Sequence, residues 1–281
     1  MSARLTRSDT RRGFAMAIVL MLLAVSGVVI AFMLDRQANQ TRTVQREIES
    51  YTFHHISRGI QEAVEAWIRS NGNNPLGPAL SDDGHAFDLV VERGQTVEVY
   101  FLDAQGAVLA EFAGLTGDSL DMAIDILQQL RRAENRRTAE YIRREGPVAI
   151  SINVAPEPVL RAVISSVLDQ IQTNALVREI MTARAAEVID RAKLEAIFRD
   201  ADTPGANIPK LTALLATEPV LWQVIAQAKS PEGVWPPPRG TIRYGGLALV
   251  STGAAAAGRN RSADLQRSSS MISWENLSEQ P

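Results

Sequence analysis

Residues 11–34, RRGFAMAIVLMLLAVSGVVIAFML, decide how the rest of the chain is organised. The stretch from Phe14 to Leu34 contains no charged residue, and Ser26 is its only hydroxyl. At ~1.5 Å per residue, a helix of this stretch measures about 31 Å, which matches the hydrocarbon core of a bilayer. A helix also satisfies every backbone hydrogen bond inside lipid. The stretch therefore predicts one membrane-spanning helix.

Charge in front of the apolar stretch predicts its orientation. One acid, Asp9, stands against four basic residues, namely Arg4, Arg7, Arg11 and Arg12. By the positive-inside rule the N-terminus stays in the cytoplasm and the rest is exported. A cleavable secretory signal would have a shorter apolar core and a small-residue cleavage site after it. Ala31-Phe32-Met33 is not such a site, so we expect a single-pass anchor.

The basic leader that ends in Gly13, followed directly by Phe14, resembles the class III leader of type IV pilins and type II secretion pseudopilins. The resemblance implies that a prepilin peptidase cuts the Gly13–Phe14 bond and methylates the new N-terminus. Most pilins carry a glutamate at the fifth mature position, which here is Ile18. The K-type minor pseudopilins of type II secretion (the general secretion pathway protein K, or GspK, family) also lack that acid. An ordinary signal anchor with a chance glycine is the alternative.

The helical pattern continues beyond the apolar stretch to about Ser70. Apolar residues recur there at spacings of three to four, as on one face of an amphipathic helix: Val44, Ile48, Tyr51, His55, Ile56, Ile60, Val64, Trp67 and Ile68. The break at 71–75, NGNNP, ends the pattern. We predict one continuous helix from Phe14 to about Ser70, and a membrane anchor joined to a separate helix is the alternative.

The remaining pattern predicts an α+β fold. Strand patterns occur at 87–91, 97–102 and 108–112, and turn residues 103–106 join the last two as a hairpin with Gly106 at positive φ. Helical patterns follow, among them a helix from Thr116 or Asp118 to about Arg144, one after Pro156 with Ile171 inward, and one at 218–229. Strand patterns return at 241–251 and 263–274. We expect the long N-terminal helix to pack on a small antiparallel sheet that carries an inserted all-helical domain.

These patterns also predict domain boundaries. A leader at 1–13 precedes the transmembrane part of the helix at 14–34 and its amphipathic continuation at 35–70. A pilin-like hairpin region at 71–115, a helical insert at 116–230 and C-terminal strands at 231–281 follow, and the last of these complete the sheet.

A second resemblance lies in residues 150–160, ISINVAPEPVL, which is similar to the I-N-V-N-T-A-P-x-x-V-L segment of the K-type family. We expect Asn153 to cap the following helix and Pro156 to begin it. Residues 175–184, ALVREIMTAR, resemble the A-x-x-I-x-x-x-R helix of the same family. The resemblance implies that the insert is SAM-like.

Composition excludes several kinds of site. The chain has no cysteine, which excludes disulfides, thiolate metal sites and cysteine catalysis. Loss of residues 1–13 takes four arginines and one aspartate from 29 basic and 32 acidic residues and leaves a net charge of −6, which disfavours nucleic acid as a partner. No hydrolase, P-loop or zincin motif is present, and His54, His55 and His85 are interpreted as structural or solvated. The paired arginines at 131–132, 136–137 and 143–144 are interpreted as a solvated face of one helix, and no enzymatic activity is expected.

The K-type resemblance implies calcium in the globular domain. Calcium takes six to eight oxygen ligands. The tight acidic clusters that could supply them are Asp82-Asp83 and the pair Asp200 and Asp202. Solvated loop acids are the alternative, and no other cofactor is expected.

Together the resemblances imply a minor pseudopilin that caps the tip of a periplasmic pseudopilus and supports protein export across the outer membrane. Its implied location is the inner membrane, with the globular part in the periplasm. Its implied partners are I- and J-type minor pseudopilins, the pseudopilus and a prepilin peptidase. A signal-anchored periplasmic binding or scaffold protein is one alternative. A membrane-tethered helix-hairpin-helix DNA-uptake module is another, but residues 163–174, VISSVLDQIQTN, lack the glycines that such a hairpin needs.

Overall fold

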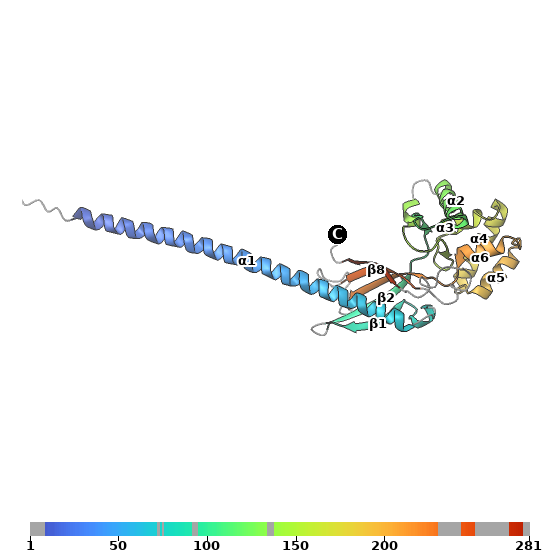
Figure 1. Ribbon diagram of the computed structural model, residues 1–281, viewed down its shortest axis with the longest axis horizontal. Helices are drawn as coiled ribbons and strands as arrows, with labels where there is room; N and C mark the ends of the chain where they lie inside the picture. Colours follow the sequence, from blue (N-terminus) through green and yellow to red (C-terminus); the bar gives the residue numbers. More distant parts are fainter. Residues whose placement is uncertain are drawn as a thin grey trace, which may run out of the picture. The chain divides into compact units, whose positions relative to one another are not determined.

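The computed structural model describes residues 9–71, 74, 76–91, 95–133, 138–229, 243–250 and 270–277. The chain divides into two compact units, Met1–Arg58 and Gly59–Pro281. The predicted fold class is confirmed, because a long N-terminal apolar helix is combined with a small antiparallel sheet and further helices (Figure 1).

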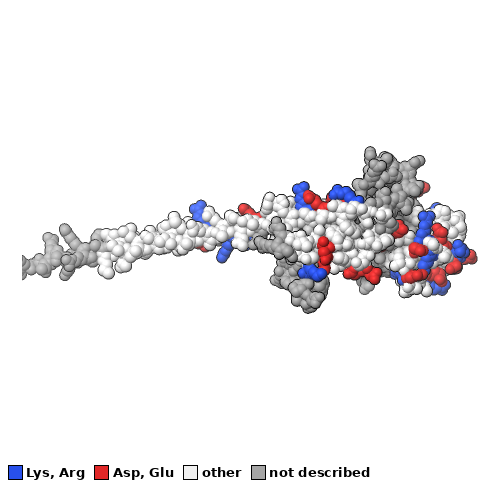
Figure 2. Space-filling view, turned by 90° about the horizontal axis from the view of Figure 1, so that it is seen from below, with Lys and Arg blue, Asp and Glu red and all other residues white. Residues whose placement is uncertain are grey.

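Helix α1 (Asp9–Asn71) contains the whole apolar stretch and confirms the prediction of one uninterrupted helix. It begins earlier than the predicted Phe14. The apolar side chains from Met16 to Leu34 are exposed, for example Met21 at 71% and Val28 at 69%. Among the described residues, α1 is the one helix that is long and apolar enough to cross a membrane, and the apolar window is not buried by the rest of the protein. The sequence from Met16 to Leu34 contains no charged residue, and none is seen on the face of this part of α1 that Figure 2 shows. It is therefore a candidate membrane anchor.

The second unit contains a five-stranded antiparallel sheet in the order β1-β2-β7-β8-β9. Its strands are β1 (His85–Val90), β2 (Thr96–Asp103), β7 (Leu221–Ala228), β8 (Arg243–Leu249) and β9 (Ser270–Asn276). A short 3₁₀ segment, η1 (Gly77–Ala79), precedes β1. Strands β8 and β9 confirm the strand patterns predicted at 241–251 and 263–274 where the structure describes them, whereas residues 241–242, 251 and 263–269 lie outside the described residues.

The end of α1 packs on this sheet. Ile60, Val64 and Ile68 are buried. The indole ring of Trp67 lies with its centroid 5.0 Å from that of Phe101 on β2 and 5.5 Å from that of Phe87 on β1. Strand β2 alternates buried and less buried residues, as a strand with one covered face must. The last turns of α1 therefore close the core over one face of the sheet.

The prediction of one apolar face along all of residues 44–68 is wrong. At about 100° per residue, the positions of Ile60, Val64 and Ile68 lie about half a turn from those of Val44, Ile48 and Tyr51 on the same helix. The first group is buried, whereas the second is 53–68% exposed. Each spacing of three or four residues shifts the angular position around the helix axis only slightly. Over about seven turns these shifts add up and carry the apolar positions to another side of the helix.

A large insert separates two neighbouring strands of the sheet. The chain leaves at the end of β2 and returns at β7, where Asp103 pairs directly with Trp222. The insert contains α2 (Asp118–Ala133), α3 (Glu157–Ser165), α4 (Gln170–Ala186), α5 (Arg191–Asp200), α6 (Ile208–Leu214) and the 3₁₀ segment η3 (Thr138–Tyr141). Two short parallel pairs complete it: β3 (Val108–Leu109) with β4 (Ile142–Arg143), and β5 (Ile150–Ser151) with β6 (Leu215–Ala216).

Several local predictions are wrong, and each error has a physical cause. The segment predicted as a helix at 218–229 forms β7, because pairing with β2 and β8 overrides the helical preference of its Ala and Gln residues. The insert thus ends before 230, the boundary drawn from sequence. The helix expected to reach Arg144 ends at Ala133. Ile171 was expected inward but is 82% exposed, because α4 begins separately at Gln170.

The hairpin expected between residues 97–102 and 108–112 is also wrong. Strand β2 pairs with β1 and β7, whereas β3 pairs in parallel with β4. Gly106 does not have a positive φ. Instead, a Cβ atom at Gly106 would lie 3.0 Å from a methyl group of Val154. The glycine is needed for close packing against the 150–160 segment and not for a tight turn.

Candidate functional site

The predicted processing bond, Gly13–Phe14, lies near the start of α1, where the backbone is helical. The residues that follow it form the exposed apolar surface from Met16 to Leu34. The bond belongs to the first compact unit of the chain, and the second unit begins at Gly59.

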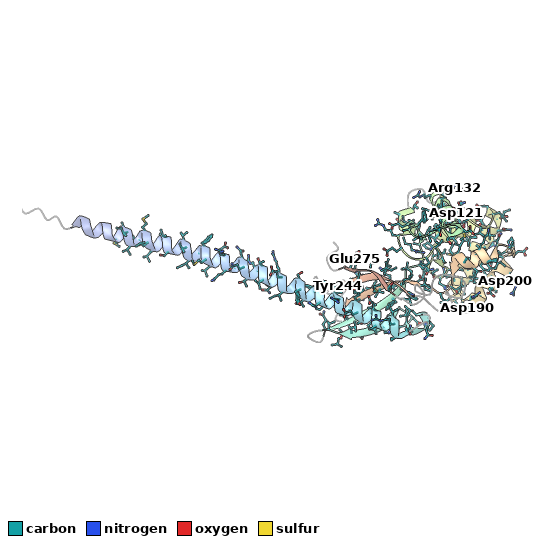
Figure 3. All side chains as sticks on the ribbon, viewed as in Figure 1. Asp121, Arg132, Asp190, Asp200, Tyr244 and Glu275 are labelled. Atoms are coloured by element: carbon teal, nitrogen blue, oxygen red, sulfur yellow. The ribbon has the colours of Figure 1, made fainter. Side chains whose placement is uncertain are left out.

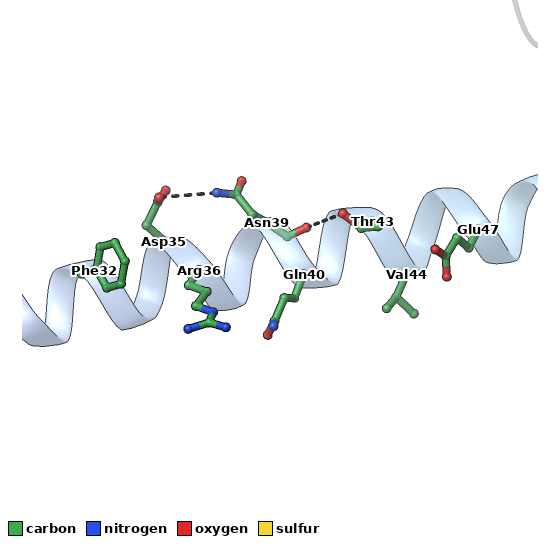
Figure 4. Close-up of a pocket in the computed structure, with 8 residues that line it drawn as sticks. All are labelled: Phe32, Asp35, Arg36, Asn39, Gln40, Thr43, Val44 and Glu47. Atoms are coloured by element: carbon green, nitrogen blue, oxygen red, sulfur yellow. Dashed lines mark hydrogen bonds between the residues drawn. The ribbon is translucent and has the colours of Figure 1, made fainter.

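Polar side chains begin directly after the apolar stretch. Figure 4 shows Asp35, Arg36, Asn39 and Thr43 on this part of α1, where the Asn39 amide donates to the Asp35 carboxylate at 3.4 Å and the Thr43 hydroxyl to the Asn39 carbonyl at 3.0 Å. The eight side chains drawn there come from one helix, so they cannot enclose a small ligand.

A buried glutamine connects the point where the chain leaves the sheet after β2 with the point where it returns at β7. Gln105 follows β2 and is 1% exposed. Its side-chain amide donates to the Ala149 carbonyl at 2.9 Å, and its side-chain oxygen accepts from the backbone N–H groups of Val220 at 2.8 Å and Leu221 at 3.3 Å. One side chain therefore ties the outgoing strand, the middle of the insert and the returning strand.

A partly buried arginine, Arg143, binds the backbone beside Gln105. The Arg143 guanidinium donates to the carbonyls of Ala107 at 2.9 Å and Ala149 at 3.2 Å, and also to those of Glu145 and Pro147. Burial lowers the pKa of Arg143 to about 10, against the opposing effect of Asp103. The group thus stays charged at neutral pH and binds four backbone carbonyls at once.

Asp103, the last residue of β2, lies beside this arginine. Its carboxylate accepts from the Gln105 backbone N–H at 2.8 Å. Burial raises the pKa of Asp103, while the Ser151 hydroxyl, the Gln105 N–H and the charge of Arg143 lower it in part. We call Asp103, Gln105 and Arg143 the joint.

Asn153 holds two loops of the insert and does not cap a helix. Its side-chain oxygen accepts from the Ile189 N–H at 2.9 Å, and its amide donates to the carbonyls of Ile189 at 3.1 Å and Thr217 at 3.4 Å. The N-cap of α3 is Pro156, without a side-chain hydrogen bond, and the helix begins at Glu157. The predicted capping role of Asn153 is therefore wrong, because its amide reaches residues far along the chain.

Arg184 joins two segments that the sequence analysis described separately, residues 150–160 and residues 175–184. This α4 residue donates to the carbonyls of Ala155 at 2.6 Å and Ile152 at 3.4 Å. The 175–184 helix is thereby bound to the 150–160 segment. Both segments are thus structural, since their polar groups are used to hold backbone carbonyls in place.

Sequence reasoning missed two members of the joint. Gln105 carries no sequence signal beyond following a strand, because a buried glutamine is recognisable only from its partners. Arg143 was assigned to a solvated helix face, which is wrong because it lies in β4 with a partly buried side chain. The sequence signal that could have identified Arg143 is the turn-rich run at 144–149 that follows it, because Arg143 binds carbonyls of that run.

The acidic pairs considered for calcium do not form a site. Asp82 and Asp83 are exposed, and the Asp83 carboxylate accepts from the His85 N–H at 3.1 Å. Asp200 ends α5 (Figure 3). Asp202 has φ 52°, and its N–H bonds to Arg199 while that of Thr203 bonds to Phe198.

These bonds around Asp202 form a helix-terminating Schellman motif, for which glycine is the usual residue. Over the part of the chain that the structure describes, no group of three or more His, Cys, Asp or Glu residues is placed to hold a metal. Because calcium needs six to eight oxygens, the residues at these positions do not fit it.

The three histidines lie in two places. His54 and His55 are on α1, where the His55 ring contacts Tyr51 with centroids 4.2 Å apart. His85 begins β1, with its ring nitrogen 2.8 Å from the Asp88 carboxylate and its ring against Tyr100. The two places belong to different units of the chain.

The chain was compared with family models, curated protein sequences and solved structures. No family model matches the chain, and no curated protein sequence matches it. The structure is similar to a chain in the crystal structure of the GspK-GspI-GspJ complex from the type 2 secretion system of enterotoxigenic Escherichia coli. The identity is 11%, the match covers 84% of this chain and 99% of that chain, and the TM-score is 0.48. At this identity and score the likeness identifies no functional residue, so the function has to come from the chain's own residues and contacts.

Proposed function

We propose that the chain is a K-type minor pseudopilin of a type II secretion system, anchored in the inner membrane and placed at the tip of a periplasmic pseudopilus. It acts by assembly with other minor pseudopilins of the I and J types, without catalysis. Processing at Gly13–Phe14 by a prepilin peptidase releases the mature chain.

One observation carries this proposal. Helix α1 exposes an uncharged apolar surface from Met16 to Leu34 and, in its last turns, buries Ile60, Val64 and Ile68 against an antiparallel sheet. A simple signal anchor needs only the first part. A helix that is both an apolar anchor and a core element of the exported unit suits a subunit that leaves lipid and enters a bundle of similar helices.

The leader residues support the same proposal. Arg11-Arg12-Gly13-Phe14 stand directly before the apolar stretch, and Ile18 occupies the position where most pilins carry an acid. A tip subunit has no subunit above it to neutralise. An apolar residue at this position therefore fits the end of a filament better than its middle.

The insert supports a capping role. Residues 104–220 leave and re-enter the sheet at the directly paired Asp103 and Trp222. The three side-chain hydrogen bonds of Gln105 and the four carbonyls bound by Arg143 hold the insert's backbone at this point. A body fixed in this way can block the addition of further subunits, whereas a loosely tethered one would not.

The first experiment tests processing. Co-expression with a prepilin peptidase should shorten the chain by the leader, residues 1–13, and add a methyl group to Phe14, as read by mass spectrometry of the N-terminus. Gly13→Ala should block this change, and Gly27→Ala, within the apolar stretch, is the matched control that should not. An unchanged mass of the native chain would overturn the proposal and leave an anchored periplasmic scaffold.

The second experiment tests capping. Replacement of residues 104–221 by Asn-Gly joins the paired Asp103 and Trp222 through a two-residue hairpin loop. We expect this variant to be processed and to enter assemblies, while pseudopilus length is no longer limited and secretion falls. Normal secretion and normal filament length with the shortened variant would overturn the capping role.

A further inference from the structure

An open pocket lies in the insert between the C-terminal end of α5 and the beginning of α6 (Figure 1), and we call it the α5–α6 pocket. Its volume is about 420 Å³, within the range of about 300–1,000 Å³ that is usual for ligand pockets. Phe198 is 1% exposed, whereas the acidic and basic residues of the lining are open to solvent. The lining residues are Glu195, Phe198, Arg199, Asp202, Thr203 and Ile208.

Asp202 lowers the stability of the fold at the position that it occupies. It has φ 52°, and no other non-glycine residue in the described part of the chain has a positive φ. Glycine would take this conformation without steric cost. The Asp202 carboxylate has no hydrogen bond or ion pair with any residue that the structure describes. A strained residue whose side chain does not serve the fold indicates a functional role.

The neighbouring Thr203 provides a second, independent observation. Its hydroxyl oxygen is buried and has no hydrogen-bond partner among the described residues. Buried polar atoms are nearly always hydrogen-bonded, so such an atom in a residue that lines a pocket indicates a partner that the folded chain does not supply. The Asp202 carboxylate and the Thr203 hydroxyl are therefore two adjacent groups that are available to a ligand.

The charges of the lining favour a cation with a single positive charge. Two carboxylates, Glu195 and Asp202, stand against one guanidinium, Arg199. The C-terminal end of α5 adds the partial negative charge of the helix dipole. Arg191 lies 3.4 Å from the Glu195 carboxylate, but this exposed pair contributes little to stability and can be given up. A divalent ion would be repelled twice as strongly by Arg199, which agrees with the poor fit of calcium here.

We propose that the α5–α6 pocket binds a primary ammonium group on a methylene chain, the chemistry of a lysine side chain or of a free aliphatic amine. An ammonium has three N–H donors, and the lining offers three acceptor groups, the carboxylates of Glu195 and Asp202 and the hydroxyl of Thr203. Phe198 and Ile208 pack along the methylene chain, as apolar surface does with the stem of lysine. The proposal is independent of the proposed function, because it uses no residue of the leader or of α1.

Titration of the full-length chain in detergent with butylammonium chloride tests the pocket, with binding followed by saturation-transfer NMR. Asp202→Gly should weaken binding about tenfold, because a charged hydrogen-bond partner is lost. This variant should also be more stable than the native chain, so weaker binding cannot be a folding defect. Asp200→Asn, which removes a neighbouring carboxylate outside the lining, is the matched control and should change binding less than about twofold. Equal binding by the native chain and Asp202→Gly would overturn the proposal.

Two further substitutions test the charge and the apolar wall separately. Arg199→Gln should strengthen butylammonium binding about threefold, because it removes a like charge. Ile208→Ala should reduce the preference for butylammonium over methylammonium, since a preference of about fourfold per buried methylene depends on apolar contact. Weaker binding in Arg199→Gln, or an unchanged preference in Ile208→Ala, would overturn the proposal.

A zero-length carbodiimide distinguishes the two sources of the ammonium in native envelopes. It condenses a carboxylate with a lysine amine to an amide, and the water that is lost converts the carbodiimide to a urea. A cross-linked peptide that joins Asp202 or Glu195 to a lysine of another protein supports a lysine side chain as the ligand. Butylammonium binding that depends on Asp202, without such a peptide, supports a free amine. A native chain that neither binds butylammonium nor forms the cross-link would overturn the proposal.

Discussion

The two attachments to the sheet differ in kind. The end of α1 is attached through apolar side chains such as Val64 and Ile68, whereas the insert is attached through the buried polar joint around Gln105. Apolar packing does not depend on direction. The stability lost on shortening a buried apolar side chain therefore grows with the amount of side chain removed. A buried hydrogen-bond network loses its contribution abruptly, because each missing partner leaves an unsatisfied group. The following substitutions test this difference, in order of decreasing effect.

Gln105→Ala should have the largest effect. It leaves the N–H groups of Val220 and Leu221 without their side-chain partner, while the Ala149 carbonyl keeps its hydrogen bond from Arg143. At about 1–3 kcal/mol for each unsatisfied buried group, we expect a loss of about 4 kcal/mol in the free energy of unfolding, measured by urea unfolding in detergent. Gln105→Glu changes few atoms but should cost nearly as much. A loss below about 1 kcal/mol would show that the network is not buried as described.

Ile68→Ala should cost about 3 kcal/mol, and Ile68→Val only about 1 kcal/mol, because Ile68 is 1% exposed and the two changes remove different amounts of packed surface. The same unfolding measurement applies, and Arg69→Ala, at a neighbouring exposed position, is the control. An equal cost for the two Ile68 variants would contradict graded apolar packing.

Asp103→Asn should change how stability depends on pH. Because burial raises the pKa of Asp103 above 3.8, the folded state holds the proton more tightly than the unfolded state. This contribution is present below pH 3.8 and is lost as the pH rises through the raised pKa. The stability of the variant relative to the native chain should therefore increase over that window, in urea unfolding at a series of pH values. Asp121→Asn, on the exposed side of α2, is the control, and an opposite slope would contradict the prediction.

Asp202→Gly should have the smallest effect and the opposite sign. Asp202 is a non-glycine residue with φ 52° at the end of α5, and glycine takes this conformation without steric cost. We expect stabilisation of about 0.5–1 kcal/mol, seen as a higher melting temperature, without change in calcium response. The prediction would be contradicted if the variant were less stable than the native chain and calcium raised the melting temperature of the native chain only. That result would show that Asp202 is a calcium ligand.

Much of the fold could be predicted because its signals are local. Neighbouring residues alone determine four of these signals: the length of the apolar stretch, its basic leader, the long helix to about Ser70, and the strand patterns at 87–91 and 97–102. The candidate processing bond and the 150–160 segment were likewise visible as short motifs. The role of Asn153 was not, since its partners Ile189 and Thr217 lie 36 and 64 positions away.

The sequence by itself determined an uncharged helix of bilayer length at the start of the chain, because length and absence of charge suffice for lipid. Only the tertiary structure decided that residues 221–228 form a strand and not a helix, since pairing with β2 and β8 outweighs local preference. It also decided that Gln105 is buried and that the Arg143 guanidinium binds four backbone carbonyls. These outcomes depend on which distant segments meet, and hydrogen bonds and packing across that distance leave no periodic pattern in the chain.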